Sequence, residues 1–291
     1  MFTAQTDSAS LLHAIACRMV CALGGHTYQP TNHAGLEFTW AERQGHHLRV
    51  LFWLCYISDK DISLRSGQAP LLTEEFCDLA IPECCIGDPG LWRLKEKIYR
   101  LLFSPHSFKI SDGELVFRIR QLDDDLESWR LSIPPEIRPK LSIPPIKTTS
   151  TQEPYVTPDI RCPYLQLEYH HIVTAIHTTV KRCAFVIHSS CNLSLEASRS
   201  TITFLKSSTT VLAEQEFSDV VFYATLAVVS LFIDILAHPQ NAGSRAALSY
   251  LSSAIEIIQK MSRLIMELID VRSCAIAKAE RDILKTDSIR S

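Results

Sequence analysis

Residues 49–82 read RVLFWLCYISDKDISLRSGQAPLLTEEFCDLAIP, and they decide the fold because a helix, a stop signal and a new helix start follow one another there. Positions 48–57 are apolar almost all round, which predicts a helix buried inside a larger helical body. Within it, an aromatic stripe at helical spacing follows an arginine: Arg49, Phe52, Trp53 and Tyr56. We therefore expect this helix to form the core of an all-α protein.

The end of this helix is marked by several local signals. Asp61 and Arg65 stand four residues apart in the acid-first order, which adds about 0.3 kcal/mol to a helix. Gly67 supplies the left-handed residue that helices commonly need to terminate, and Pro70 prevents the helix from resuming. Thr73, followed by two glutamates, is expected to cap the next helix.

Helical periodicity recurs along the rest of the chain, whereas the apolar and polar alternation of strands is sparse. A first helix is expected over 7–23, with a core face made of Leu12, Ile15, Ala16, Met19 and Leu23. Another begins near Asp112 and has a packing seam made of Leu115, Ile119, Leu122, Leu126 and Trp129. Further helices are expected over 91–103, 164–188, 195–216, 218–238 and 242–276.

The prolines divide the chain. The segment 134–160 is rich in Pro, Ser and Thr without periodic apolar residues, so we expect an extended connector. It separates an N-terminal helical half, 1–133, from a C-terminal half, 161–291. In the final helix an apolar stripe is expected to pack within the chain, with a homodimer seam as the alternative: Leu248, Leu251, Ile255, Ile258, Ile265 and Ile269.

Composition argues against several classes of protein. The net charge is −3 and no run of basic residues occurs, so the chain itself is not expected to bind DNA. The N-terminus lacks the features of a secretory signal, so the ten cysteines are expected to be reduced and mostly buried. The apolar run 220–236 contains polar residues and is expected to be a buried helix, with no membrane contact.

Metal-binding motifs are not evident. No Cys-x-x-Cys occurs, and neither the pair Cys17 and Cys21 nor the pair Cys84 and Cys85 is accompanied by further ligands, so no metal or other cofactor is expected in these residues. Several histidines fall near one another in the sequence without the spacing of a known metal motif, and we interpret them as ordinary packed or solvated side chains: His46, His47, His170, His171, His177 and His188. No nucleophile elbow or phosphate loop is present either.

Residues 49–82 resemble the signature of the fungal-specific transcription factor domain, the middle homology region of fungal binuclear zinc cluster regulators. The order of an arginine, Phe-Trp, an aspartate, Ser-Leu-x-x-Gly and Pro-Leu-Leu carries the likeness. The turn 67–70 reads GQAP, where the family more often has a form close to GRPP. Segments 11–26, 122–138, 167–177 and 231–240 resemble other helices of that region, in the same order.

This resemblance implies a non-enzymatic regulatory domain in the nucleus, which modulates transcription through an effector or a protein partner. It also implies that DNA is bound only through a zinc cluster module outside these residues, and that zinc belongs to that module. By this likeness the core of the domain is defined by residues with structural roles: Arg49, Phe52, Trp53, Asp59, Arg65, Gly67 and Pro70.

A rival interpretation starts from the acidic run Asp123, Asp124, Asp125, Leu126, Glu127. Carboxylates one helical turn apart can hold Mg²⁺ against a diphosphate, as in terpene synthases, which are all-α enzymes acting on prenyl diphosphates. The second metal motif of those enzymes is not found in the later helices. A solvated acidic face opposite Leu122, Leu126 and Trp129 explains the run without a metal.

Overall fold

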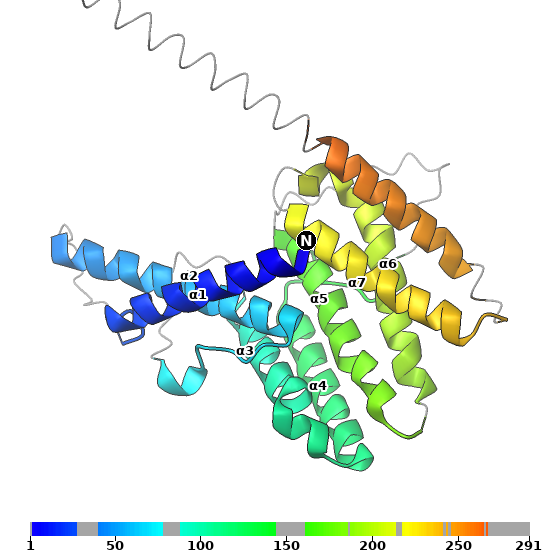
Figure 1. Cartoon of the computed structure of the whole chain (residues 1–291), viewed down its shortest axis with the longest axis horizontal. Coiled ribbons are helices and arrows are strands. Elements are labelled where there is room, and N and C mark those ends of the chain that lie inside the picture. The colour runs from blue at the N-terminus through cyan, green and yellow to red at the C-terminus, as the bar shows by residue number, and fades with distance from the viewer. Residues whose placement is uncertain are drawn as a thin grey trace, which may run out of the picture. The chain divides into compact units, whose positions relative to one another are not determined.

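The structure is a computed structural model that describes residues 2–27, 40–77, 88–143, 161–185, 187–213, 217–240, 243, 246–264 and 266. The chain divides into two compact units, Met1–Ser132 with Arg182–Ala184, and Ile133–Lys181 with Phe185–Ser291. The described residues form helices and no strand, which confirms the all-α class (Figure 1).

The first unit is built around two adjacent helices, α1 (Phe2–Ala22) and α2 (Trp40–Ser66), drawn in blue in Figure 1. His13 on α1 lies near Asp59 on α2, while Gly25, just after α1, lies against Phe52. The helices are therefore antiparallel. A Cβ at Gly25 would stand 3.2 Å from the Phe52 Cβ, so a glycine permits this close approach.

α2 ends as the sequence predicted. Gly67 adopts a φ of +73°, and its N–H donates to the Ser63 carbonyl at 2.9 Å, which closes the last turn. The prediction for the next segment holds in part. Thr73 occupies the N-cap position before two glutamates, but its hydroxyl makes no capping hydrogen bond, and the element that it begins is a three-residue 3₁₀ turn, η1 (Glu74–Phe76). The extended chain before η1 is anchored by Asp59, whose carboxylate accepts from the backbone N–H groups of Leu71 and Leu72.

The unit continues through α3 (Pro89–Ile98), the π-helical turn η2 (Tyr99–Phe103), the 3₁₀ turn η3 (Pro105–Lys109) and α4 (Asp112–Ser132). Asp88 caps α3 by accepting from the Gly90 N–H at 2.8 Å. The wider turn of η2 closes with the Ser104 N–H donating to the Tyr99 carbonyl at 2.9 Å. The predicted seam of α4 is confirmed, since its members are buried: Leu115, Ile119, Leu122, Leu126 and Trp129.

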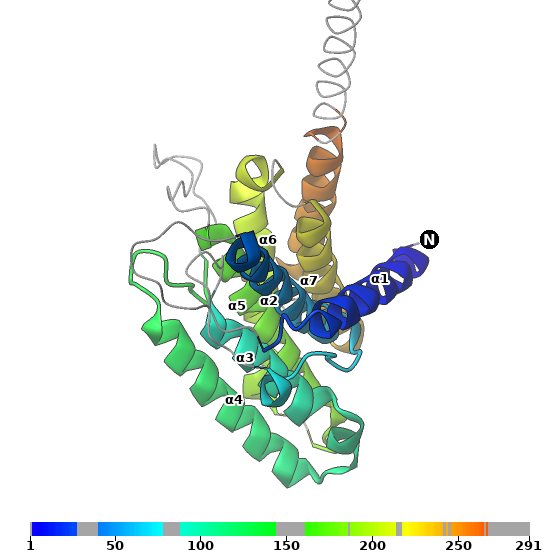
Figure 2. The ribbon, with the colours of Figure 1, turned by 90° about the vertical axis from the view of Figure 1, so that its left-hand side faces the viewer.

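The second unit packs α5 (Arg161–Thr178) against α6 (His188–Ala213) and α7 (Phe217–Ala237), with residues 246–264 forming a further helix. α5 continues as η4 (Thr179–Arg182), whose last residue belongs to the first unit. The labelled helices α5, α6 and α7 neighbour one another in both views (Figure 2). One apolar cluster joins all four helices: Leu167, Ile202, Phe204, Leu205, Val220, Tyr223, Ala224, Ala227, Ala254, Ile257 and Met261.

Three predicted buried faces need correction. In α1 the expected core face is exposed, with Leu12 at 67% and Met19 at 60%, and the side that packs inward carries Cys17 and Val20. α2 is not buried on all sides as predicted, since Leu51 and Leu54 are more than half exposed. In residues 246–264 the buried face is not the predicted stripe, whose Leu248 and Ile255 are exposed; it consists of Ala247, Ala254, Ile257 and Met261. Helices with apolar residues on several faces do not reveal which face meets a neighbour.

α7 is less buried than expected. Its stretch Val220–Ala237 is long and apolar enough to cross a membrane, and 33% of it is buried inside the structure. Its exposed apolar residues are Val229, Phe232, Ile233 and Leu236. The core helices of globular proteins satisfy the same length and hydropathy criteria.

Some predicted features lie outside the described residues. These are most of the connector, residues 144–160, the pair Cys84 and Cys85, and two positions of the final stripe, Ile265 and Ile269. The described part of the connector, residues 134–143, contains a turn and no helix.

Candidate functional site

Four of the predicted signature residues, Arg49, Phe52, Trp53 and Asp59, lie along the buried side of α2 in the first unit. Arg49 is buried at 2% exposure, and its Nη1 donates to the Gly25 carbonyl at 3.0 Å. Its guanidinium also lies 5.2 Å from the Phe52 ring centroid and 5.7 Å from that of Trp53. A buried arginine thus joins the end of α1 to the aromatic stripe of α2 through a hydrogen bond and cation–π contacts.

The aromatic stripe forms the centre of this unit. Phe52, Trp53 and Tyr56 are each 1% exposed or less. Trp53 packs edge-on against Tyr56 at 5.4 Å between ring centroids and lies 5.7 Å from Trp92 of α3. These are the separations at which aromatic pairs attract each other beyond simple burial. The stripe therefore packs α2 against α3.

Asp59 holds the chain that follows α2. Its carboxylate accepts hydrogen bonds from the backbone N–H of Leu71, at 2.9 Å to Oδ1, and of Leu72, at 3.0 Å to Oδ2. Its side chain is 3% exposed. Asp59 thereby fixes the segment after Gly67 against the helix, which gives a physical reason for an aspartate at this position.

A buried lysine beside Asp59 completes an ionic network that sequence reasoning missed. The Lys60 ammonium lies 3.3 Å from Asp59 Oδ2 and 3.0 Å from Glu96 Oε2, and it also donates to the Leu72 carbonyl. It stands 4.3 Å from the centroid of the Tyr56 ring, whose hydroxyl donates to Glu96 Oε2 at 3.1 Å. Burial and the nearby Glu96 carboxylate raise the pKa of Tyr56. Glu96 lies far along the chain on α3, so no local signal points to this network.

The remaining signature residues lie at the C-terminal end of α2. Arg65 is half-buried in the last turn, Gly67 ends the helix, and Pro70 is half-buried beyond it. The Tyr99 hydroxyl donates to the Gly67 carbonyl at 3.3 Å, while Asp61 pairs with the buried Lys95 of α3. The end of α2 is therefore tied to η2 through Gly67 and to α3 through Asp61.

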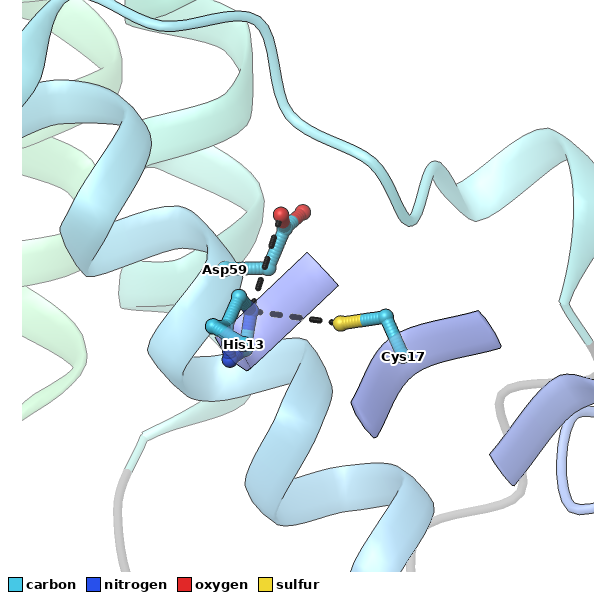
Figure 3. A group of neighbouring side chains, drawn as sticks. All are labelled: His13, Cys17 and Asp59. Atoms are coloured by element: carbon cyan, nitrogen blue, oxygen red, sulfur yellow. Dashed lines mark hydrogen bonds and ion pairs between the residues drawn. The ribbon is translucent and has the colours of Figure 1, made fainter. Parts of the chain in front are cut away.

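A cleft and a set of thiols lie on the α1 side of the same network. The cleft has a volume of about 390 Å³ and is lined in part by Ser10, His13, Asp59, Ser63 and Gln68. His13 and Cys17 from α1 and Asp59 from α2 point toward one another beside it (Figure 3).

Short contacts join the three side chains. His13 Nε2 is 3.2 Å from Cys17 Sγ and 3.9 Å from Asp59 Oδ1. Cys17 also shares a hydrogen bond with the thiol of Cys55, which raises the pKa of Cys17 and lowers that of Cys55 to about 7. The described cysteines are free thiols: Cys17, Cys21, Cys55, Cys77, Cys183 and Cys191.

The acidic run considered for an enzyme lies on α4. Asp125 pairs with Lys97 at 2.5 Å and Glu127 with Arg130 at 2.7 Å, whereas Leu126 is buried. The run is thus an ion-paired helix face. Among the described residues, His13, Cys17 and Asp59 are the group whose ligand atoms lie close enough to hold a metal ion.

Three histidines of the second unit are packed, whereas His188 and His238 are exposed. His170, His171 and His177 are each 5% exposed or less, on the buried helix α5. His170 Nε2 lies 2.9 Å from the Lys140 carbonyl, and its Nδ1 lies 3.2 Å from the Thr201 hydroxyl. Burial lowers the pKa of His170 to about 4. His170 thus holds the chain after Ile133 against α5 and α6.

Comparison with known proteins indicates the class of this chain. It is 26% identical over 257 aligned residues to an ABC-transporter-regulating transcription factor of Aspergillus fumigatus, and to one of Aspergillus oryzae at the same identity and length. Each alignment covers 72% of this chain. No family profile matches the chain, and no solved structure matches it. The chain is thus similar to fungal transcription factors, which supports a regulatory role in transcription.

The chain spans about a quarter of the length of these relatives, 27% in each case. The relatives are named for the regulation of ABC transporters, and that property is theirs. The buried network around α2 has the character of a structural core, with its polar groups paired among themselves.

Proposed function

We propose that this chain is the regulatory domain of a fungal transcription regulator, similar to the middle homology region of zinc cluster factors. The observation that carries the proposal is the similarity to two transcription factors over 72% of the chain. The order of the signature residues and the burial of Arg49, Phe52, Trp53 and Asp59 support the finer comparison with the middle homology region.

In this role the chain acts on transcription from the nucleus through an effector or a protein partner. Its net charge of −3 and its lack of basic runs argue against direct contact with DNA phosphates. DNA contact is assigned to a zinc cluster module outside these residues, since Cys-x-x-Cys does not occur within them. Zinc in that module is separate from any chemistry of the residues described above.

The enzyme alternative is not favoured by a specific observation. In the acidic run, Asp125 and Glu127 are paired with Lys97 and Arg130, which already supply the positive charge that a cation would bring. The relatives are named as transcription factors, which favours a non-enzymatic regulator.

A tethering assay tests the proposal. The chain is fused to a DNA-binding domain from an unrelated protein, and a reporter gene carrying the matching sites is measured in a fungal host. We expect reporter output to change by several-fold relative to the DNA-binding domain alone, and the effect to disappear with Trp53→Ala. An unchanged reporter, with the fusion shown to be nuclear and intact, would count against the regulatory role.

A further inference from the structure

α1 and α2 present two facing pairs of metal-binding side chains. His13 and Cys17 are four residues apart on α1, and a spacing of four places side chains on the same helix face. Cys55 and Asp59 have the same spacing on α2. Because the two helices are antiparallel, His13 lies opposite Asp59 and Cys17 lies opposite Cys55.

We propose that these facing pairs bind one Zn²⁺ ion between α1 and α2, with the ligands His13, Cys17, Cys55 and Asp59. Two thiolates, one imidazole and one carboxylate are ligand types that zinc accepts in four-coordinate sites. Thiolate sulfur favours zinc over the hard cations Mg²⁺ and Ca²⁺. The site is separate from the zinc cluster module invoked above, and it lies within the first unit.

The separations between the ligand atoms fit the size of such a site. Zinc bonds of 2.0–2.3 Å in a tetrahedron place ligand atoms about 3.3–3.8 Å apart. His13 Nε2 is 3.2 Å from Cys17 Sγ and 3.9 Å from Asp59 Oδ1, and the three ligand atoms all lie within 4.8 Å of one another. Cys55 is close enough to share a hydrogen bond with Cys17. Cys55 is outside that group of three, so its thiol must turn from Cys17 toward the ion, by a change of side-chain rotamer, to complete the four ligands.

The surroundings support the ligands. The Asp59 carboxylate is held in place by the N–H groups of Leu71 and Leu72, which is how outer-shell hydrogen bonds orient metal ligands. Each carboxylate oxygen has two acceptor positions, so Oδ1 can accept a hydrogen bond from the Leu71 N–H and still bind an ion on the side of His13. Lys60, 3.3 Å from Oδ2, offsets the excess negative charge of two thiolates and a carboxylate. The cleft beside His13 and Asp59 provides a path for the ion.

A cobalt titration of the reduced full chain tests the site, because Co²⁺ replaces Zn²⁺ in tetrahedral sites and absorbs visible light. We expect one Co²⁺ per chain, with the d–d bands of tetrahedral cobalt and a thiolate charge-transfer band, both removed by Zn²⁺. Cys17→Ser, Cys55→Ser and His13→Gln should each weaken binding at least about tenfold, the lower end of what even an outer-shell change costs. Zn²⁺ should also raise the Tm of the first unit, followed by tryptophan fluorescence.

Two controls make the result specific. Cys21→Ser, one turn beyond Cys17 on α1, and Cys191→Ser, in the second unit, should leave cobalt affinity and spectrum unchanged. The proposal is overturned if the folded, reduced chain gives no tetrahedral cobalt spectrum, or if Cys17→Ser and Cys55→Ser leave that spectrum intact. It is also overturned if Cys21→Ser abolishes binding. The tethering assay does not depend on any of these readings.

Discussion

Arg49 on α2 donates a hydrogen bond to the carbonyl of Gly25, at 3.0 Å, and this bond joins α2 to the chain just after α1. Both the charge and the length of the side chain matter, because the guanidinium also lies over the Phe52 and Trp53 rings. Because the contact is buried, water would not replace the hydrogen bond if the arginine were removed.

We expect Arg49→Leu to destabilise the first unit by about 3 kcal/mol, since the carbonyl of Gly25 loses a charged donor and the cation–π contacts disappear. Urea unfolding followed by tryptophan fluorescence measures this directly. The four tryptophans, Trp40, Trp53, Trp92 and Trp129, all lie in the first unit, so the signal reports on that unit alone. Wild-type stability in the variant would show that the bond contributes nothing.

Trp53→Ala should destabilise the first unit by about 3–5 kcal/mol, as truncation of a large buried aromatic side chain does. Trp53 is 1% exposed and touches Tyr56 and Trp92. Its neighbour Leu54 is 55% exposed, so Leu54→Ala is the matched control and should change stability by no more than about 0.5 kcal/mol. Equal effects of the two substitutions would contradict the placement of Trp53 in the core.

The buried pair of Lys60 and Glu96 should be strongly coupled. Lys60→Met leaves the carboxylates of Asp59 and Glu96 without their buried cation and should cost about 3–5 kcal/mol. In a double-mutant cycle with Glu96→Gln, the coupling energy should reach at least about 1.5 kcal/mol. The control is the half-exposed pair of Lys97 and Asp125, where Lys97→Met should cost no more than about 1 kcal/mol. Additive effects at Lys60 and Glu96 would mean that the two residues act independently.

Two glycine substitutions should act in opposite directions. Gly67 has a φ of +73° with no atom near its would-be Cβ, so Gly67→Ala adds only backbone strain, about 1 kcal/mol of destabilisation. Gly113 lies in α4, where a Cβ also meets open space, and Gly113→Ala should stabilise by about 0.5–1 kcal/mol. Thermal unfolding of the two variants measures both effects. A gain of stability in Gly67→Ala as well would contradict the helix end at Gly67.

The stability of the second unit should fall in mild acid because of His170. Burial lowers the pKa of this histidine from 6.5 to about 4, so the unfolded state takes up its proton first as the pH falls. The contribution of neutral His170 to the free energy of unfolding is complete above pH 6.5. It is lost progressively toward pH 4, by roughly 3 kcal/mol in all. Urea unfolding followed by circular dichroism at a series of pH values measures the slope.

His170→Gln should flatten the pH dependence between pH 6.5 and 4, whereas His238→Gln, at an exposed position after α7, should leave it as in the wild type. If His170→Gln still loses stability steeply as the pH falls, other groups are responsible for the effect.

The sequence around α2 was informative because its signals are local. Gly67 and Pro70 mark a helix end through the conformations that their own backbones allow, and the spacing of Phe52, Trp53 and Tyr56 places them on one face of any helix. The spacing of apolar residues in α4 likewise predicts its buried seam. In α1, by contrast, the spacing of Leu12 and Met19 predicts one buried face, whereas the structure buries the side that carries Cys17 and Val20.

The candidate zinc ligands show the same limit. His13 with Cys17, and Cys55 with Asp59, are visible in the sequence only as two unrelated pairs, and neither pair alone has enough ligands for a metal. In the sequence Lys60 is an ordinary charged residue, and its partner Glu96 comes from α3. In each case the missing partner belongs to another helix.

By itself the sequence determined that the chain is helical, where α2 ends, and which class of regulator it resembles. These features depend on neighbours along the chain: the backbone preferences of glycine and proline, the period of the helix, and the order of motifs. Only the tertiary structure decided which face of α1 is buried, how Lys60 is neutralised, and that His13 and Cys17 meet Cys55 and Asp59. Those outcomes depend on the register between helices, which is set by packing over the whole unit and leaves no mark in a short stretch of sequence.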